Sequence, residues 1–343
     1  MRASLWITRR VVHRLAIKLI ERALRRCAER MPSSTFRLTS REDLLGYVPY
    51  GLGFYPQESL VLVGLGQKRL ELCARADASW PTRQHVSQFA QALRRIRKIT
   101  AVLLLGYGGA EIADPTRAVG SALEQRGYPV MELLRVTGDR FFCLTCGECT
   151  PPEGRPFEVK ASAAAAAAIF AGMVARPDRA SVERLVRPIG GLAAVAMSQA
   201  VDRAGKRLDE APCHLQQWGR EAVEQALSKA RHGDRLDDDE VAWLTLVLQD
   251  TEVRDHAWRL TDREVWQLEL WLDLTRRAEP SLAAPLAALL SWCAWRQGDG
   301  ALAMVAAARA QRLDPAQRLA QFVADLLDRA SPPSTVTKWP VPL

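Results

Sequence analysis

Two periodicities of apolar residues divide the chain into a half that contains strands and a half that is helical. In the first half, apolar residues alternate with polar ones or form short continuous runs, and segments with helical spacing separate these runs. The predicted strands are residues 59–65, 69–77, 99–105 and 129–136, and the predicted helices between them are 82–98 and 114–126. A tight turn joins the first two strands into a hairpin. Strands that alternate with helices predict an α/β domain with a mixed sheet over residues 35–155.

Cap residues and prolines set the predicted ends of two helices. A short helix opens at residues 38–45, where Thr39 or Ser40 can accept a hydrogen bond from a first-turn amide. Proline disfavours a helical conformation in the residue before it, so we expect this helix to end at Pro49. A later helix is expected to begin with Asp114 as its cap, followed by a proline in its first turn.

Strand patterns stop near residue 155, and the remaining chain has helical periodicity. Residues 156–190 predict a helical connector that includes six consecutive alanines. Every segment from 191 to 330 predicts a helix, so we expect an all-helical domain there. Seven of the ten tryptophans lie between Trp218 and Trp295, as expected for large side chains wedged between packed helices. Residues 331–343 are rich in proline and are expected to be a disordered tail.

One segment of the helical half matches a known repeat length. Residues 284–317 fit the 34-residue tetratricopeptide pattern without a gap. The turn falls at Gly298 and Asp299, and the small residues Ala303 and Ala310 stand where helices must approach closely. An alanine replaces the early tryptophan of the pattern, and a serine replaces its usual glycine. The sequence predicts a tetratricopeptide-like domain, with a plain helical bundle as the alternative.

The first 34 residues form a separate basic arm. Apolar residues within 5–27 follow helical spacing, with basic side chains on the other side, so this segment predicts an amphipathic helix. Such a helix can contact an anionic membrane surface or a partner, or it can pack on the body. A third interpretation is that the natural protein starts at Met31 and that the arm lies upstream of that start.

The charge balance argues against binding to nucleic acid. The net charge is +8, but residues 1–30 alone carry +7, which leaves about +1 for residues 31–343. A duplex-binding protein needs a basic surface on its folded body, and these totals do not supply one. No apolar run is long enough to cross a bilayer, and charges interrupt the start of the chain where a secretory signal needs an apolar core. We therefore expect a soluble, cytoplasmic protein.

A distinctive motif precedes and includes the first predicted strand. The segments Arg37–Leu45, Val48–Tyr50 and Leu52–Leu65 closely resemble the opening of the bacterial family known as domain of unknown function 4192. Cys143–Gly154 and Trp295–Pro315 are similar to later landmarks of that family, so the resemblance extends over nearly everything but the arm and the tail. Family members carry a lone cysteine and then an adjacent pair, whereas the cysteines here are evenly spaced. The resemblance implies no activity.

A glycine-rich loop follows the predicted strand that ends at residue 105. Gly106, Tyr107, Gly108 and Gly109 lie between this strand and a helix, where backbone amides can bind an anion. Glu111 stands where a dinucleotide-binding motif needs its third glycine, and no Gly-Lys-Ser/Thr follows for a P-loop. The loop is a candidate ligand site, and a flexible turn is the alternative.

Three evenly spaced cysteines form the constellation with the clearest chemical potential. Cys143, Cys146 and Cys149 give two Cys-x-x-Cys steps, a spacing that lets two thiolates bind one Zn²⁺ ion. Structural zinc usually has four Cys or His ligands, so a fourth must come from elsewhere, and Cys73 on a predicted strand is the candidate. A reversible disulfide between Cys143 and Cys146 is an alternative, as are thiols with no special role. Zinc is the candidate cofactor.

Patterns of common catalytic sites are missing from the sequence. The five histidines are isolated, no Gly-x-Ser-x-Gly motif occurs, and the acidic run 237–240 precedes a helix, where it is expected to cap the N-terminus. We therefore expect a partner-binding or scaffold protein whose helical half holds another protein. One alternative is an enzyme with its site at the strand ends of the α/β half. The other is a metal- or redox-responsive regulator that uses the cysteine cluster.

Overall fold

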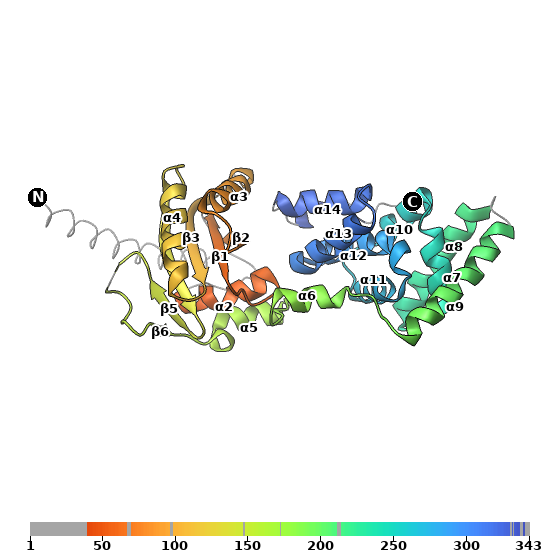
Figure 1. Cartoon of the computed structure of the whole chain (residues 1–343), viewed down its shortest axis with the longest axis horizontal. Helices are drawn as coiled ribbons and strands as arrows, with labels where there is room; N and C mark the ends of the chain where they lie inside the picture. Colours follow the sequence, from red (N-terminus) through yellow and green to blue (C-terminus); the bar gives the residue numbers. More distant parts are fainter. Residues whose placement is uncertain are drawn as a thin grey trace, which may run out of the picture. The chain divides into compact units, whose positions relative to one another are not determined.

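The computed structural model describes most of the chain in two compact units. The described residues are 40–66, 70–96, 99–146, 148–171, 173–210, 214–329, 331, 333–336 and 339. The first unit is Met1–Arg179 and the second is Ala180–Leu343. Figure 1 colours the first from red to yellow-green and the second from green to blue. The basic arm predicted for residues 1–34 lies outside the described residues.

A mixed sheet of six strands, in the order β2-β1-β3-β4-β5-β6, forms the centre of the first unit. The strands are β1 (Ser59–Gly66), β2 (Leu70–Asp77), β3 (Ile99–Tyr107), β4 (Val130–Thr137), β5 (Arg140–Cys143) and β6 (Arg155–Pro156). Only β3 and β4 pair in parallel, and the other neighbours are antiparallel. The predicted hairpin and mixed α/β sheet are confirmed. The short strands β5 and β6 were not predicted.

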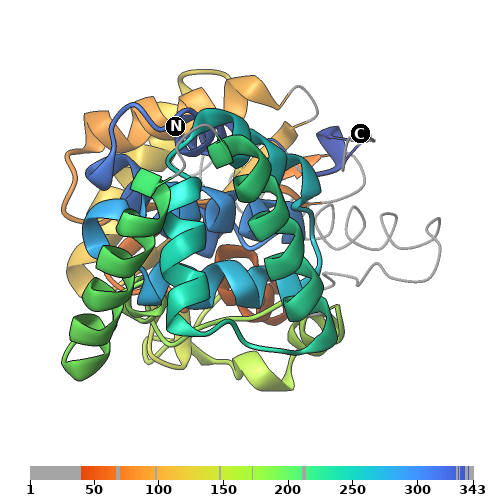
Figure 2. The same ribbon diagram turned by 90° about the vertical axis from the view of Figure 1, so that its right-hand side faces the viewer.

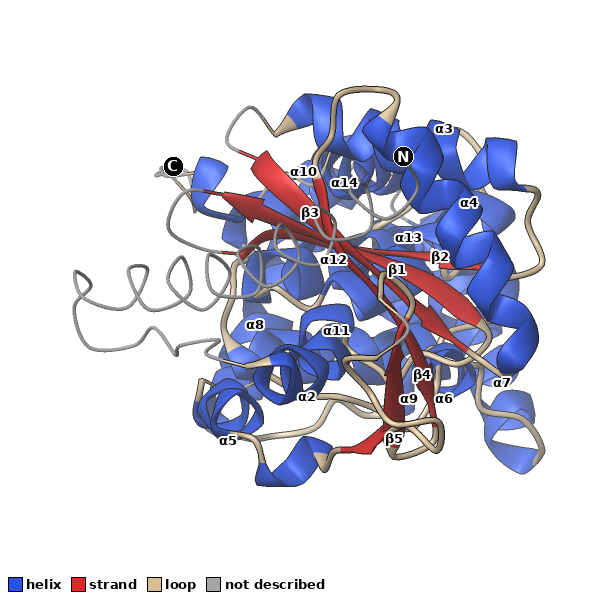
Figure 3. Cartoon of the chain, turned by 90° about the vertical axis from the view of Figure 1, so that its left-hand side faces the viewer, coloured by secondary structure: helices blue, strands red, loops and turns tan. Residues whose placement is uncertain are grey.

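Helices cover both faces of this sheet (Figure 3). On one face, Leu44, Leu45 and Val48 of α2 (Arg41–Leu52) pack against alternate residues of β1, β3 and β4. On the other face lie α3 (Thr82–Arg95) and α4 (Ala113–Glu124). α5 (Ala163–Phe170) packs against α2, on the side away from the sheet.

Two predicted helix ends differ from the structure. Ser40 caps α2 as expected, because its side chain accepts a hydrogen bond from the Asp43 amide at 3.0 Å. Pro49, however, lies inside α2, which continues to Leu52. Val48 and Tyr50 on either side of the proline are buried, and this packing outweighs the lost amide donor. Asp114 is in the first turn of α4 and is not its cap, because the 3₁₀ turn Ala110–Ile112 runs directly into the helix.

The first unit extends beyond residue 155, where the sequence patterns placed its end. β6 pairs with β5, and the following segment folds back so that α5 packs on α2. The predicted connector, residues 156–190, is therefore divided between the two units. Its alanines explain the difference, since their small side chains let α5 approach α2 closely, with Ala164, Ala165 and Ala168 buried.

The second unit is helical throughout its described residues. Its helices are α6 (Arg179–Leu185), α7 (Leu192–Glu210), α8 (Leu215–His232), α9 (Asp238–Val247), α10 (Thr251–Leu260), α11 (Val265–Arg277), α12 (Ala284–Gln297), α13 (Gly300–Leu313) and α14 (Arg318–Asp328). In Figure 2 this unit faces the viewer, with α7, α8 and α9 packed side by side. Asp237 and Glu240 form a reciprocal capping box on α9, so capping by the acidic run is confirmed. Within the described part of the chain, no helix is long and apolar enough to cross a membrane.

The helices α12 and α13 are joined at the predicted turn. Gly298 ends α12 with a φ of 89°, a left-handed conformation that glycine adopts without strain. The Asp299 side chain caps α13, and both Ala303 and Ala310 are fully buried. These features agree with a helix pair of the expected lengths. The tetratricopeptide-like repeat itself stays a prediction.

Described residues beyond α14 contact the helical unit. Trp295 donates a hydrogen bond from its indole nitrogen to the Ser331 carbonyl at 3.1 Å, and Pro333–Thr335 form a 3₁₀ turn. These contacts of residues 331 and 333–335 differ from the disorder expected for residues 331–343, of which only Val336 and Trp339 are also described. Proline-rich composition predicts weak local structure, but it does not reveal that aromatic side chains far away in sequence can hold the segment.

Candidate metal centre

The cysteine cluster begins where the β4–β5 hairpin ends. Cys143 is the last residue of β5 and pairs with Leu134, so its side chain projects from the face that α2 covers. Two further hydrogen bonds extend the pairing past the strand: the Leu144 amide donates to the Leu133 carbonyl, and the Leu133 amide donates to the Thr145 hydroxyl. The chain then turns away and reaches Cys146 and Cys149.

The segment that carries the cysteines is anchored at both ends. The Cys143 amide donates to the Thr150 hydroxyl at 3.1 Å, which closes the cysteine loop onto its own start. Arg140 donates to the Gly154 carbonyl at 3.0 Å. Gly154 has a φ of 80°, and a Cβ there would meet the Phe142 ring at 2.6 Å, so only glycine fits this turn. The loop between β5 and β6 is therefore held in a defined conformation.

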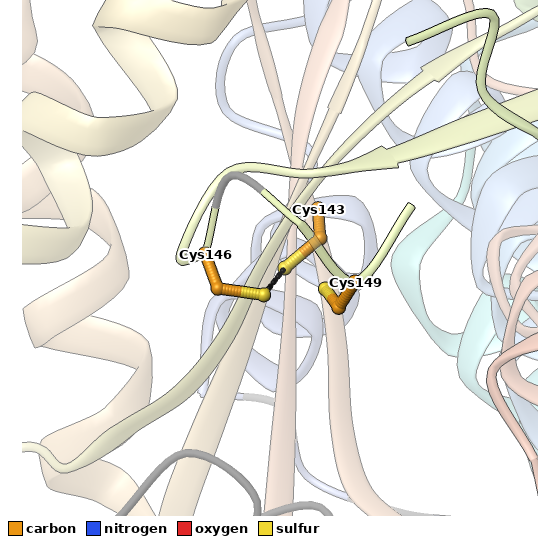
Figure 4. A group of neighbouring side chains, drawn as sticks. All are labelled: Cys143, Cys146 and Cys149. Atoms are coloured by element: carbon orange, nitrogen blue, oxygen red, sulfur yellow. Dashed lines mark hydrogen bonds between the residues drawn. The ribbon is translucent and has the colours of Figure 1, made fainter. Parts of the chain in front are cut away.

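The three thiols of this loop converge on one point (Figure 4). Their sulfur atoms all lie within 4.8 Å of one another, and the Sγ atoms of Cys143 and Cys146 are 3.8 Å apart. Among the described residues, this is the only group of three or more Cys, His, Asp or Glu side chains close enough to share a metal ion. The sequence prediction that these three cysteines act together is therefore consistent with the geometry.

A buried ion pair lies beside the cluster. Arg41, the first residue of α2, forms a salt bridge with Glu132 of β4, and their side chains are only 16% and 2% exposed. Both terminal nitrogens of Arg41 also lie 3.9 Å from the Cys149 sulfur. Arg41 therefore places a positive charge between a buried carboxylate and a thiol.

These neighbours shift the protonation of the thiols. The pKa of Cys143 is lowered, first by a hydrogen bond from the Cys149 thiol and then by the backbone amides of Cys146 and Thr145 and the charge of Arg41. The pKa of Cys149 is raised, because it holds the proton that it donates to Cys143 and because it is partly buried. Burial alone would lower the pKa of Arg41, but the charge and hydrogen bond of Glu132 raise it. These shifts favour a thiolate at Cys143, beside the positive charge of Arg41, with the shared proton on Cys149.

One side of the cluster opens to a pocket. The pocket has a volume of about 690 Å³ and is lined by Cys149 and by the charged residues Arg140, Glu148, Glu153 and Arg155. Its lining thus includes two basic and two acidic side chains. Cys149 is therefore the cysteine that a small molecule in this pocket would meet first.

Cys73 does not belong to the cluster, and the expectation that it supplies a fourth ligand is wrong. It lies on β2, at one edge of the sheet, whereas Cys143 lies on β5. The strands β1, β3 and β4 lie between them, so the separation is about 19 Å at the usual spacing between strands. Burial raises the pKa of the Cys73 thiol to about 12, as expected for a small residue in the core.

The glycine-rich loop at residues 106–109 is occupied by the chain's own groups. The Gly109 amide donates to the Glu111 carboxylate at 2.9 Å, and the Gly108 amide donates to the Val136 carbonyl at 3.0 Å. Gly106 faces α4, where a Cβ would overlap Thr116, and the Tyr107 side chain is buried on the opposite face. An anion would have to displace Glu111, so the contacts favour a structural turn over the predicted ligand site.

Sequence reasoning missed Arg41 and Glu132 as parts of the cysteine site. Arg41 precedes Cys149 by 108 residues, and no local pattern connects them. Arg41 does belong to the motif that carries the family resemblance, and Glu132, the lone acidic residue of β4, was a second signal. Only the pairing of β4 with β5 and the docking of α2 bring the two residues to the thiols.

Comparisons with known proteins give one match. A family described as a domain of unknown function (DUF4192) matches residues 42–334, which include the sheet, the cysteine cluster and the helical unit. Neither the curated proteins nor the solved structures contain a significant match. Because the matched segment is most of the chain, the protein belongs to the family called domain of unknown function 4192.

Proposed function

We propose that the α/β unit is a metal-binding module in which Cys143, Cys146 and Cys149 hold one Zn²⁺ ion. The observation that carries the proposal is the convergence of three sulfur atoms within 4.8 Å on an anchored loop. Thiolates are the ligands that select zinc over hard cations such as Mg²⁺ and Ca²⁺. The proposal makes the chain a metal-responsive or metal-dependent protein.

The spacing of two sulfur atoms already suits tetrahedral zinc. Zinc–sulfur bonds are about 2.3 Å long, and two sulfurs at adjacent corners of a tetrahedron are then about 3.8 Å apart. The Sγ atoms of Cys143 and Cys146 are 3.8 Å apart. The Cys149 sulfur lies within 4.8 Å of both, so a shift of about 1 Å would bring it to the same spacing.

The surroundings of the cluster support a bound, negatively charged centre. Three thiolates and one Zn²⁺ ion carry a net charge of −1, and the guanidinium of Arg41 stands 3.9 Å from the Cys149 sulfur to balance it. The amides of Thr145 and Cys146 direct hydrogen bonds at the Cys143 sulfur. Hydrogen bonds of this kind stabilise thiolate ligands and fix their orientation.

Three protein ligands leave one position of a tetrahedron for another group. Because Cys149 lines the pocket, a fourth ligand could reach a bound ion from that side, as in catalytic zinc sites and unlike closed structural sites. We therefore propose an exchangeable fourth ligand, which is water or a small molecule from the pocket. This favours a sensing or catalytic zinc ion over a purely structural one.

Metal titration of the reduced full-length protein tests the proposal. A chromophoric chelator would report competition for zinc, and we expect one zinc ion per chain. Cys149→Ser should weaken binding at least tenfold, since a thiolate ligand is lost. Cys293→Ser is the matched control, because Cys293 is a buried lone thiol of the helical unit, and it should leave affinity unchanged. Equal zinc binding by both variants would contradict the proposal, as would a Cys143–Cys146 disulfide that forms while zinc is in excess.

We propose as a second function that the helical unit binds a polypeptide, through a tetratricopeptide-like arrangement of α11–α14. The supporting observation is that backbone carbonyls of the segment beyond α14 already accept hydrogen bonds from α12, through Trp295 and Arg296. An array of short synthetic peptides, probed with the full-length chain and with a chain that ends at Ser331, tests this function. Failure of every peptide to bind either protein would refute it.

A further inference from the structure

A cluster of aromatic rings forms a cage on the helical unit. Trp258 of α10, Trp292 of α12 and Phe322 of α14 contact one another with ring centroids 5.5 to 6.2 Å apart. The three residues come from three helices, so the cage depends on the packed unit and not on one local segment. Exposed to water, such a set of rings is an apolar patch of the kind that marks an interaction site.

The indole of Trp339 occupies this cage. Its ring centroid is 4.9 Å from that of Trp292 and 5.2 Å from that of Trp258. The indole nitrogen donates to the Thr261 carbonyl at 2.7 Å, an oxygen that also accepts from the Trp292 indole at 2.9 Å. The cage therefore offers both apolar contact and an oriented acceptor, which together distinguish tryptophan from phenylalanine.

The rest of the bound segment is held through its main chain. Arg296 donates from one terminal nitrogen to the carbonyls of both Pro333 and Val336, each at 3.0 Å. Its Nε atom donates to Asp262 at 2.6 Å, so the guanidinium is oriented by α12 and the loop before α11. Main-chain carbonyls are present in any sequence. Arg296 therefore selects a peptide whose main chain forms a short 3₁₀ turn, and the cage selects its tryptophan.

We propose that this surface is a binding site for a peptide that combines a short 3₁₀ turn with a tryptophan anchor, and that the chain's own residues 333–336 and Trp339 are its resting occupant. The natural ligand is a segment of a partner protein with the same chemistry. It presents two main-chain carbonyls to Arg296, as Pro333 and Val336 do, and its tryptophan follows the second of these residues by three positions. Such a partner binds by displacing Trp339. The inference rests on the second proposed function and gives it a ligand class and a built-in competitor.

Two observations favour exchange over a permanent contact. The segment is held by the Trp339 side chain and by hydrogen bonds from Arg296 to its main chain, and the regular structure of its described residues is a single 3₁₀ turn. The Trp258 indole nitrogen, moreover, is buried without a hydrogen-bond partner among the described residues. A ligand that placed a carbonyl there would satisfy a donor that the resident segment leaves unpaired, and would gain an advantage over it.

Binding of a synthetic peptide of residues 332–343 tests the proposal. Fluorescence anisotropy would compare the full-length chain with a chain that ends at Ser331. We expect the shortened chain to bind the peptide roughly ten- to hundredfold more tightly, because an attached competitor acts at a millimolar effective concentration. The full-length Trp339→Ala variant, in which the cage is vacated but the chain is complete, should also gain affinity. This variant tests the proposal even if the shortened chain fails to fold.

A peptide in which alanine replaces tryptophan is the matched control, and it should bind neither protein. The proposal is refuted if the shortened chain and the Trp339→Ala variant both bind the tryptophan peptide no better than the full-length chain does. It is also refuted if the alanine peptide binds equally well. In either case, binding of other peptides from the array would still support the partner-binding function of the helical unit. If no peptide on the array binds either, both this proposal and the partner-binding function are refuted.

Discussion

Replacing Arg41 by methionine should destabilise the α/β unit through Glu132. The methionine keeps much of the aliphatic packing but leaves the Glu132 carboxylate, which is 2% exposed, without its guanidinium partner. Unit charges about 4 Å apart interact by about 4 kcal/mol at the effective dielectric of partly buried pairs. Breaking a buried pair from one side typically costs about 3–5 kcal/mol, and the partial exposure of Arg41 points to the lower end. We expect a loss of about 3 kcal/mol.

The matched control is a second arginine–glutamate pair on the same unit. Arg155 lies 4.0 Å from Glu42, and both side chains are largely exposed. Pairs of this kind contribute at most about 1 kcal/mol, so Arg155→Met should change stability little. The double variant Arg41→Met with Glu132→Gln should recover about 2 kcal/mol, because the uncompensated charge is gone.

Hydrogen exchange followed by mass spectrometry reads out the unit that contains the substitution. Amides of β3 and β4 report its opening free energy without interference from the helical unit. The reasoning fails if Arg41→Met costs no more than Arg155→Met. It also fails if Glu132→Gln does not rescue Arg41→Met.

Three further changes test other parts of the account. Gly219→Ala in α8 should lower the free energy of unfolding by about 1–3 kcal/mol in thermal unfolding, because the new Cβ would lie 2.5 Å from a Val253 methyl. Gly205→Ala in α7 is the matched control: its Cβ meets nothing within 4 Å, so it should raise the free energy of unfolding by up to about 1 kcal/mol. Arg309→Met should stabilise the helical unit by about 1–3 kcal/mol in urea unfolding, since burial lowers the Arg309 pKa to about 10 and its terminal nitrogens have no partners among the described residues. Zinc affinity should fall by at least about tenfold for each unit that the pH decreases near neutrality, because Cys149 has a raised pKa and must release its proton to bind. A pH-independent affinity in the chelator competition would contradict this.

Local patterns were sufficient for most of the fold because the signals are strong over short distances. The apolar runs that became β1 and β3 and the alternation in β2 specify strands by their local sequence patterns. Asp237 and Glu240 specify the start of α9 by hydrogen bonds within four residues. β5 and β6 were not predicted because strands of four and two residues, respectively, are too short to show a periodic pattern of apolar residues. Their pairing depends on β4 and on the turn at Gly154.

Of the candidate site, only the three cysteines could be predicted, because they lie within seven residues of one another in the sequence. Its electrostatics depend on Arg41 and Glu132, whose proximity follows from sheet order and helix docking. Cys73 failed as a ligand for the same reason, since sequence patterns predicted its strand but not the three strands between it and β5. The segment around Trp339 was predicted to be disordered because its partners, Trp258 and Trp292, lie far away in the sequence.

X-ray absorption at the zinc edge of the reconstituted full-length protein tests the central claim most directly. The account predicts one zinc ion per chain, with three sulfur ligands at about 2.3 Å and one oxygen or nitrogen ligand at about 2.0–2.1 Å. In the Cys149→Ser variant the sulfur count should fall to two. A spectrum with no sulfur ligands, or retention of less than about 0.2 zinc per chain after removal of excess metal, would contradict a three-thiolate site at Cys143, Cys146 and Cys149.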